Sequence, residues 1–194
     1  MDKEKSLTFI TGNSGKLAEV QAFLPFVAGK SLELPEIQET DLQKVVEAKL
    51  KAAAALHEGP VIVDDTALYL ECFGAQNGQD GLPGPLIKWF LKTITNVGLA
   101  KIAQRLGKTK AYACTTIGFH YRGRAYFFQG VVQGSVVAPQ GTAGFGWDHI
   151  FVPQGQNQTF ASMGLQEKNK ISPRAIAVQK LQAFLEAEEN QKGC

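Results

Sequence analysis

The sequence predicts an α/β fold built on one mixed β-sheet, and three observations support this fold class. In the first half of the chain, short apolar runs alternate with amphipathic helical patterns, which is typical of strands joined by helices. In the second half, two β-rich segments flank a tight turn, which is typical of an antiparallel hairpin. The 194 residues suffice for one core and contain no repeat or linker, so residues 1–194 are expected to form a single domain.

The first elements are a strand, a glycine loop and a helix. Residues 7–10 form a short β-rich run that leads into the turn cluster of residues 11–15. A helical pattern follows from Lys16, because the apolar residues after it recur on one face.

A second helix and a buried strand come next. Residues 41–57 are rich in Ala, Lys and Leu and are expected to form the helix, with a cap near Asp41. Residues 61–63 are a continuous apolar run, which is typical of a central strand covered on both faces. This strand is expected to end at Asp64 and Asp65.

The remaining elements are a rigid turn, two helices, a hairpin, a glycine-rich loop and a C-terminal helix. Pro85 suits the first position of a helix, and Arg122 with Gly123 supplies the hairpin turn. The turn is expected over residues 81–85, the two helices over residues 85–94 and 99–106, and the hairpin over residues 111–132. The glycine-rich loop is expected over residues 141–148 and the C-terminal helix over residues 172–189.

The composition excludes several classes of protein. Hydrophobic residues make up 44% and charged residues 20%, which are ordinary globular values. The net charge of +2 and the lack of a basic patch give no support to a nucleic-acid partner.

No apolar run approaches the roughly 18 residues of a membrane span, and the first residues resemble no signal or transit peptide. We therefore expect no membrane partner and a cytoplasmic location. Three cysteines without a Cys-x-x-Cys pair argue against a disulfide framework.

The first glycine loop has the chemistry of a phosphate-binding site. Glycines let backbone N–H groups approach an anion, the start of a helix adds partial positive charge, and Lys16 adds a full charge. The loop is not a Walker A motif, because Ile10 occupies its first glycine position and Leu17 follows the lysine. The alternative is a tight turn with a solvated lysine.

A pair of carboxylates, Asp64 and Asp65, follows the apolar run of the central strand. Such a pair is costly to bury without a cation, and ligands of α/β sheets gather at the carboxyl ends of strands. Magnesium prefers one or two carboxylates together with water and phosphate oxygens, and Glu36 can add another oxygen. The alternative for the pair is ordinary helix or turn capping.

A third candidate is the glycine-rich loop of residues 144–148. Phe145 and Trp147 can stack on a nucleobase from this loop, whereas the alternative places both rings in the core. The three histidines lack the spacing of metal ligands, and no Gly-x-Ser-x-Gly nucleophile motif is present.

Together, these segments resemble the inosine triphosphate pyrophosphatase family. The ordered combination spans almost the whole chain and is far more specific than any single segment. The resemblance runs through residues 11–16, 34–36, 63–66, 81–90, 145–148, 167–169 and 172–174.

The resemblance implies a fold, a reaction and an assembly. The fold is a single elongated α/β domain with a long, mixed, twisted sheet, two lobes and a substrate cleft between them, and members are usually homodimers. The implied reaction is Mg²⁺-dependent hydrolysis of non-standard purine nucleoside triphosphates (ITP, dITP and XTP) to the monophosphate and pyrophosphate. Glu36 and Asp65 are the implied metal ligands, and Asp65 is the implied acceptor for the proton of the attacking water, with Asp64 assisting.

The resemblance also assigns substrate contacts, with one departure from the family pattern. The family commonly reads Ser-His-Arg where this chain reads Ser172-Pro173-Arg174, so no base contact is carried onto Pro173. The implied substrate-binding residues are Thr11, Gly12, Asn13, Ser14, Gly15, Lys16, Lys49, Thr66, Lys88, Phe145, Gly146, Trp147, Asp148, Lys168 and Arg174.

Two rival functions remain at this point. One is a related pyrophosphatase for modified pyrimidine or methylated nucleotides, against which the aromatic loop and Arg174 argue only through the family. The other is a nucleotide-binding module without turnover. A passive module has little need of clustered carboxylates beside a triphosphate, so Glu36, Asp64 and Asp65 argue against it.

Overall fold

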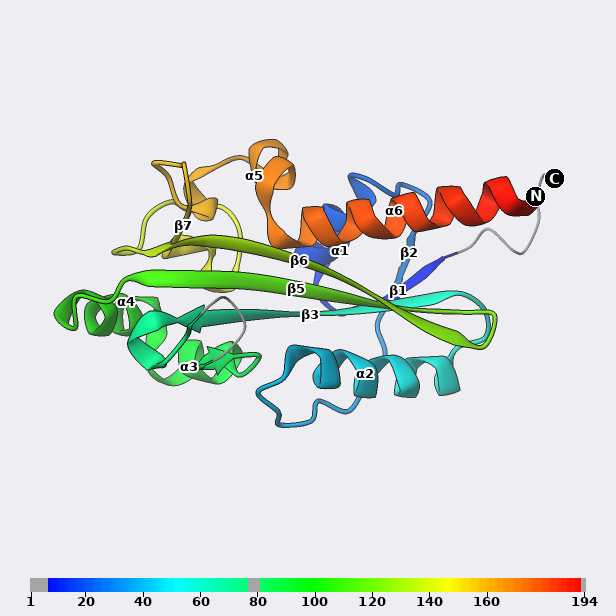
Figure 1. The fold of residues 1–194 in the computed structure, drawn as a ribbon, viewed down its shortest axis with the longest axis horizontal. Helices are drawn as coiled ribbons and strands as arrows, with labels where there is room; N and C mark the ends of the chain where they lie inside the picture. The colour runs from blue at the N-terminus through cyan, green and yellow to red at the C-terminus, as the bar shows by residue number, and fades with distance from the viewer. Residues whose placement is uncertain (1–6, 77–80, 193–194) are drawn as a thin grey trace.

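The computed structural model describes residues 7–76 and 81–192 and shows a twisted sheet with helices on both faces (Figure 1). The strands of this sheet are β1 (Thr8–Ile10), β2 (Ala28–Lys30), β3 (Val61–Leu70), β4 (Pro83–Gly84), β5 (Lys110–Tyr121), β6 (Arg124–Val136) and β7 (Phe151–Pro153). The α-helices are α1 (Ser14–Gln21), α2 (Leu42–Leu56), α3 (Ile87–Thr93), α4 (Thr95–Arg105), α5 (Leu165–Ile171) and α6 (Pro173–Lys192). Short 3₁₀ helices are η2 (Glu71–Phe73), η3 (Gly146–His149) and η4 (Phe160–Ser162).

The sheet is mixed, as the sequence predicts. Its order is β2-β1-β3-β5-β6-β7, and β4 also pairs with β3. β1 runs parallel to β2 and β3, whereas β3, β5, β6 and β7 are antiparallel. The β5–β6 hairpin turns at Arg122 and Gly123, whose φ angles of 51° and 74° suit the turns that follow the twist of a hairpin.

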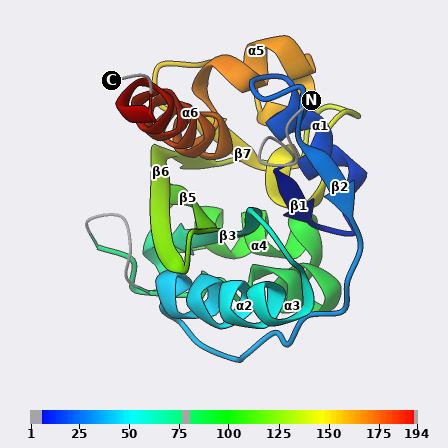
Figure 2. The same cartoon turned by 90° about the vertical axis from the view of Figure 1, so that its right-hand side faces the viewer.

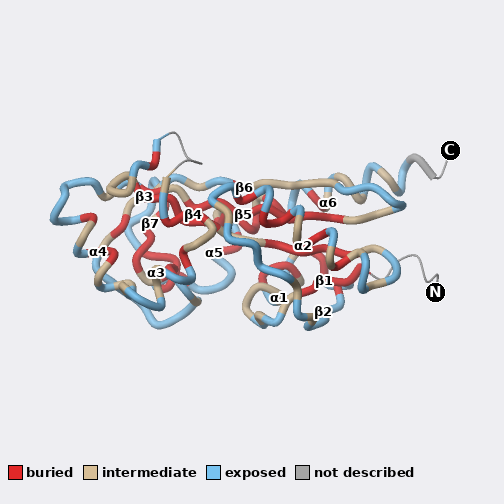
Figure 3. Tube along the Cα trace, turned by 90° about the horizontal axis from the view of Figure 1, so that it is seen from below, coloured by how far each residue is buried: buried red, intermediate tan, exposed pale blue. Residues whose placement is uncertain are grey.

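Two layers of helices sandwich the sheet. Helices α1, α5 and α6 lie on one face, and α2, α3 and α4 lie on the other (Figures 1 and 2). Alternate residues of β3 serve the two layers: Ile62 packs with the α1 and α6 side, whereas Val61 and Val63 pack with α2. β3 is buried along most of its length, and buried stretches follow the central strands through the molecule (Figure 3).

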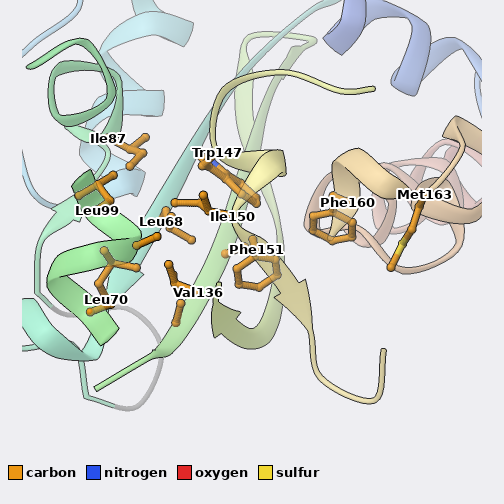
Figure 4. Packing of buried hydrophobic residues seen from close by; sticks show 14 residues of the cluster. Leu68, Leu70, Ile87, Leu99, Val136, Trp147, Ile150, Phe151, Phe160 and Met163 are labelled. Carbon is orange, nitrogen blue, oxygen red and sulfur yellow. The ribbon is translucent and has the colours of Figure 1, made fainter. Parts of the chain in front are cut away.

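A separate apolar cluster fills the end of the molecule beyond the cleft. Figure 4 shows Trp147, Phe151 and Leu68 among its members, with Leu99 contributed by α4. The Trp147 ring meets Phe151 edge-on, with ring centroids 5.4 Å apart. This cluster anchors the 144–148 loop against the sheet.

The strongly patterned elements form where the sequence places them. Helix α2 begins after Asp41, whose carboxylate accepts a hydrogen bond from the Gln43 N–H at 2.9 Å. Helix α6 begins at Pro173, a residue that suits the first turn because its missing N–H would have no partner there. Helix α3 begins at Ile87 rather than Pro85, because Pro83 and Gly84 pair with β3 instead.

The expected end of β3 at Asp64 and Asp65 is wrong. The strand continues through both residues to Leu70 and pairs with β5 along its whole length. Asp65 and Thr66 are its only partly exposed residues, so the carboxylates lie in the middle of a strand and cap neither a helix nor a turn.

A gap in the pairing of β3 creates the opening of the fold. On the edge away from β5, β1 pairs with Val61 and Ile62, and β4 pairs with Leu68 and Tyr69. Within the described ranges, no strand pairs with residues 63–67 on that edge. Asp65 and Thr66, the partly exposed residues of β3, lie along this unpaired stretch.

Two further expectations concern cysteines and membranes. Cys72 and Cys114 are free thiols, and Cys194 lies outside the described residues, as does the charged start of the chain at residues 1–6. In residues 7–76 and 81–192, no helix combines the length and apolarity that crossing a bilayer requires.

Candidate active site

A cavity of about 650 Å³ lies at the gap beside β3. Its walls come from the loop after β1, from α1, α2 and α3, from the 144–148 loop and from the start of α6. Every residue that the resemblance assigns to substrate or metal lines this cavity, except Ser14 and Gly15. Segments far apart in the sequence therefore meet in one place.

The glycine loop forms the start of α1. Asn13 caps the helix, because its side chain accepts a hydrogen bond from the Lys16 N–H at 3.1 Å, and its own N–H donates to Thr11 Oγ1 at 3.1 Å. Thr11, Asn13 and Lys16 face the cavity, so the positive end of the helix is presented to an anion there. Gly15 serves packing: a Cβ atom at this position would lie 2.8 Å from the Phe145 ring.

Adjacent positions on β3 place the two aspartates on opposite faces of the sheet. Asp65 shares its face with Val63 and α2, whereas Asp64 shares its face with Ile62, α1 and α6. The two carboxylates therefore belong to different sets of partners, and a reading of them as one acidic pair is wrong.

Asp65 faces a group of charges from α2, α3 and the loop before α2. Its Oδ2 accepts a hydrogen bond from Lys49 Nζ at 2.9 Å, and its Oδ1 accepts one from the Thr66 N–H at 2.8 Å. Lys49 Nζ also lies 3.3 Å from Glu36 Oε1, and Lys88 Nζ lies 3.4 Å from Glu36 Oε2. The same ammonium group thus contacts both carboxylates.

These contacts set the charges of the group. Burial favours a raised pKa for Glu36, but Lys49 and Lys88 outweigh burial and hold that pKa below its usual value. Burial likewise favours a lowered pKa for Lys49, but the attraction of Asp65 and Glu36 prevails and raises it. Lys49 and Glu36 are therefore both charged near neutral pH.

Asp64 lies in a buried ion network on the other face. Its Oδ1 accepts a hydrogen bond from Lys16 Nζ at 2.8 Å, and its Oδ2 accepts one from Arg174 Nε at 3.0 Å. Burial favours a raised pKa for Asp64, but the charges of Lys16 and Arg174 outweigh it and lower the pKa to about 2. Asp64 is thus ionised and held by two cations, which leaves it poorly placed to accept a proton.

The network continues from Arg174 toward the 144–148 loop. Arg174 Nη1 donates to Glu19, and Lys168 Nζ lies 2.7 Å from Glu19 Oε1 and 2.6 Å from Asp148 Oδ2. Burial favours a raised pKa for Glu19, but Arg174 and Lys168 prevail and lower it. Charges of alternating sign therefore run from the phosphate loop to the 144–148 loop through side chains that are almost fully buried.

The two aromatic residues of the 144–148 loop both line the cavity, but they differ in burial. Lys168 Nζ lies 4.7 Å from the centre of the Phe145 ring, and the Arg174 guanidinium lies 5.9 Å from it. Trp147 is only 8% exposed and packs within the apolar cluster of Figure 4. For Trp147 the structure supports the alternative of a core ring, and only Phe145 offers a substantial ring face.

The sequence profile of the Ham1 family matches residues 7–184. The chain belongs to the Ham1 family. Two curated relatives, both inosine triphosphate pyrophosphatases, extend this finding. The one from Pyricularia oryzae is 44% identical over 191 residues, which cover 96% of this chain and 96% of that protein. The one from Schizosaccharomyces pombe is 39% identical over 192 residues, which cover 96% and 98%.

Solved Ham1 structures confirm the fold. The Staphylococcus aureus Ham1 protein is similar with a TM-score of 0.74 at 23% identity, over 95% of this chain and 100% of that chain. A Coxiella burnetii Ham1 protein gives a TM-score of 0.74 at 24% identity, over 94% and 98%. The elongated mixed α/β fold that the resemblance implies is therefore present in this Ham1 chain.

Sequence reasoning missed one central member of the Ham1 site. Glu19 is 2% exposed and joins Arg174 to Lys168, yet a single glutamate in a short helix carries little information by itself. One signal was available: Glu19 stands three residues after Lys16 in the same helix, so it lies on the same side of the helix as the lysine of the phosphate loop.

Proposed function

We propose that this Ham1 protein hydrolyses non-standard purine nucleoside triphosphates, such as ITP, dITP and XTP, to the monophosphate and pyrophosphate. One observation carries the proposal. A single cavity combines the positive start of α1 with the partly exposed carboxylate of Asp65, which is supported by Lys49. The two relatives named inosine triphosphate pyrophosphatase support the same reaction, because each aligns over nearly the whole chain.

The charges of the cavity suit a triphosphate. Lys16 and the N–H groups at the start of α1 are placed to hold phosphate oxygens from one wall, and Lys49 and Lys88 approach from the other. Asp65 is the group that can take a proton from water, because it is partly exposed to the cavity and Asp64 is held by two cations. Water attack on phosphorus needs no covalent intermediate, which agrees with the missing nucleophile motif.

Magnesium is the proposed cofactor, with Glu36 and Asp65 as its ligands. The structure supports the fit, since one ammonium group, that of Lys49, already lies within 3.3 Å of both carboxylates. In the described part of the chain, no cluster of three or more acidic, His or Cys residues could hold a metal. Magnesium binds to one or two carboxylates and completes its shell with water and substrate phosphates, so Glu36 and Asp65 are the protein ligands that it requires here. Bound there, magnesium supplies charge neutralisation and polarisation of the reacting phosphate.

The base is proposed to lie against the Phe145 ring, beside Lys168. Arg174 lies next to the Phe145 ring and is held there, because Glu19, Asp64 and Thr66 accept hydrogen bonds from its three nitrogens. We therefore assign Arg174 chiefly to holding the network and not to a direct contact with the base edge.

ITP incubated with the protein and magnesium is expected to yield IMP and pyrophosphate in equal amounts. Chromatography of the nucleotides and an enzymatic pyrophosphate assay measure both products. Chelation of the metal is expected to abolish the reaction. Release of orthophosphate through IDP would contradict the pyrophosphatase assignment, and tight ITP binding without products would favour the binding module.

Modified pyrimidine and methylated nucleotides test the rival pyrophosphatase. They are assayed in parallel with ITP, and a kcat/KM for either class above that for ITP would favour the rival.

The protein is proposed to form a homodimer, as the family resemblance implies. Several large apolar side chains are exposed on the single chain, which is consistent with a contact surface. Sedimentation at micromolar concentration is expected to show a species of twice the 21.0 kDa chain mass. A single species at the chain mass would argue for a monomer.

A further inference from the structure

The 144–148 loop is fastened to the rest of the molecule at three points. Asp148 binds Lys168 at 2.6 Å, and Trp147 packs in the apolar cluster. The third fastening comes from α4, outside the site described above: Asn96 Nδ2 donates a hydrogen bond to the Gly146 carbonyl at 2.9 Å. Asn96 does not line the cavity, so it can act on a substrate only through this loop.

The loop combines two glycines of positive φ with the short 3₁₀ helix η3, and Asn96 adds a contact from another helix where η3 begins. Gly144 and Gly146 have φ angles of 75° and 63°, a region that glycine enters as readily as any other. Hydrogen bonds within η3, from the Asp148 N–H to the Phe145 carbonyl and from the Ile150 N–H to the Trp147 carbonyl, hold this turn locally. Within reach of Gly146, the structure offers Leu91 of α3 as an apolar neighbour and Asn96 as a hydrogen-bond donor.

Asn96 is presented by a strained junction between α3 and α4. Thr95, immediately before it, has a φ angle of 66°, which is costly for a β-branched residue. Gly98 permits the tight junction, since a Cβ atom there would lie 2.7 Å from Ile94 Cγ2. The backbone thus holds an unfavourable conformation at the point where Asn96 reaches the loop.

The Asn96 amide is used for this one contact. Its Oδ1 is buried and has no hydrogen-bond partner among the described residues. A flipped amide would set Oδ1 against the Gly146 carbonyl, acceptor against acceptor, so the donating orientation is the one that the site permits. A side chain with an unpaired buried oxygen contributes little to stability, which points to the Gly146 contact as its role.

We propose that Asn96 is a positioning residue for base selection, an inference that rests on the proposed function. A trans peptide directs its C=O and N–H groups oppositely. With the Gly146 carbonyl turned toward Asn96, the Trp147 N–H points away from α4, and it donates no hydrogen bond to any described residue. Trp147 lines the cavity together with Phe145, so Asn96 helps to keep this hydrogen-bond donor unused in the lining of the cavity.

The consequence for selectivity follows from the two kinds of purine. Hypoxanthine and xanthine present an oxo acceptor at position 6, whereas adenine presents an amino donor. A flip of the peptide between Gly146 and Trp147 would place a carbonyl oxygen where the Trp147 N–H now lies. The N–H can donate to the oxo group of hypoxanthine or xanthine, whereas a carbonyl would accept from the amino group of adenine. That flip would break the hydrogen bond from Asn96 to the Gly146 carbonyl, so Asn96 adds to the hold of η3 and favours oxo purines.

Two substitutions test the proposal. Asn96→Asp keeps the shape but removes the donor, and Asn96→Ala removes the side chain. Gln104→Ala, on an exposed position of the same helix, is the control. We expect both Asn96 variants to lower the ratio of kcat/KM for ITP to that for ATP by about tenfold, equivalent to about 1.4 kcal/mol. Inhibition by inorganic pyrophosphate is expected to stay at the wild-type level, because the phosphate loop is untouched.

A second measurement does not depend on activity. Hydrogen exchange of a peptide covering residues 144–148 is expected to be faster in Asn96→Ala than in wild type and in Gln104→Ala. Unchanged exchange would overturn the fastening even if the wild-type protein proves inactive on ITP. Equal loss of ITP and ATP turnover, or an unchanged ratio in both variants, would overturn the role in base selection. A wild-type protein that releases no pyrophosphate from ITP would instead refute the proposed function.

Discussion

Asp65→Asn is expected to reduce kcat for ITP by at least about 100-fold, the scale of general base catalysis. Asparagine keeps the size of the side chain but loses its charge and its capacity to accept a proton. In the structure Asp65 lines the cavity, and its Oδ2 accepts a hydrogen bond from Lys49. The variant therefore also weakens the proposed magnesium site. Folding should persist, because the side chain is partly exposed and β3 is paired with β5 throughout.

Steady-state kinetics at saturating magnesium measure this effect, with circular dichroism as the check on folding. Glu58→Gln, which removes an exposed carboxylate in the loop after α2, is the matched control and should retain wild-type turnover. Near-normal kcat in Asp65→Asn would show that another group accepts the proton.

Arg174→Ala is expected to lower the free energy of unfolding by about 3–5 kcal/mol, the usual cost of breaking a buried ion pair. Arg174 is 4% exposed and lies between Glu19 and Asp64, so its removal leaves two buried carboxylates without their shared cation. Urea denaturation at pH 7 measures the loss. Arg105→Ala, at the exposed end of α4, is the control and should change stability little.

The pH dependence of the loss has a definite sign. In the folded wild type the pKa of Asp64 is about 2, below its ordinary value of 3.8, so its contribution to stability is full above pH 3.8 and falls away toward pH 2. Without Arg174 that pKa rises, so the gap between variant and wild type is expected to narrow as the pH falls from 5 toward 2. A variant of wild-type stability that loses only its preference for ITP over ATP would show that Arg174 contacts the base directly.

Local patterns were sufficient to predict several elements of this fold. Helix α2 and the β5–β6 hairpin carry their own caps, turns and periodicity, so neighbouring residues determine them. β2 and β7, each three residues long, were not predicted, because their pairing depends on distant strands. The continuation of β3 was missed because Asp64 and Asp65 interrupt its apolar run with charges that only tertiary partners can compensate.

The candidate site also has one part that local patterns predict and another that depends on distant residues. Thr11, Asn13 and Lys16 form a contiguous loop between a strand and a helix, so their grouping is visible in the sequence. Glu19 owes its place to Lys168 and Arg174, which stand some 150 residues away. Such a network leaves no local pattern. The family resemblance named Lys168 and Arg174, but their buried pairing with Glu19 is a property of the folded chain.

The long strands beneath the cavity determine how the cleft can move. β3, β5 and β6 run side by side through the middle of the molecule (Figure 1), and their hydrogen-bonded ladder includes Asp64, Asp65 and Thr66 of the cavity. Closure by rigid lobes needs a few hinge residues that absorb large changes in φ and ψ. A continuous ladder offers no such residues and the 144–148 loop is fastened, so we expect opening and closing to fall to the loop that carries the exposed Glu36. The rate at which product leaves is then expected to depend on the Glu36 loop more than on the sheet below it.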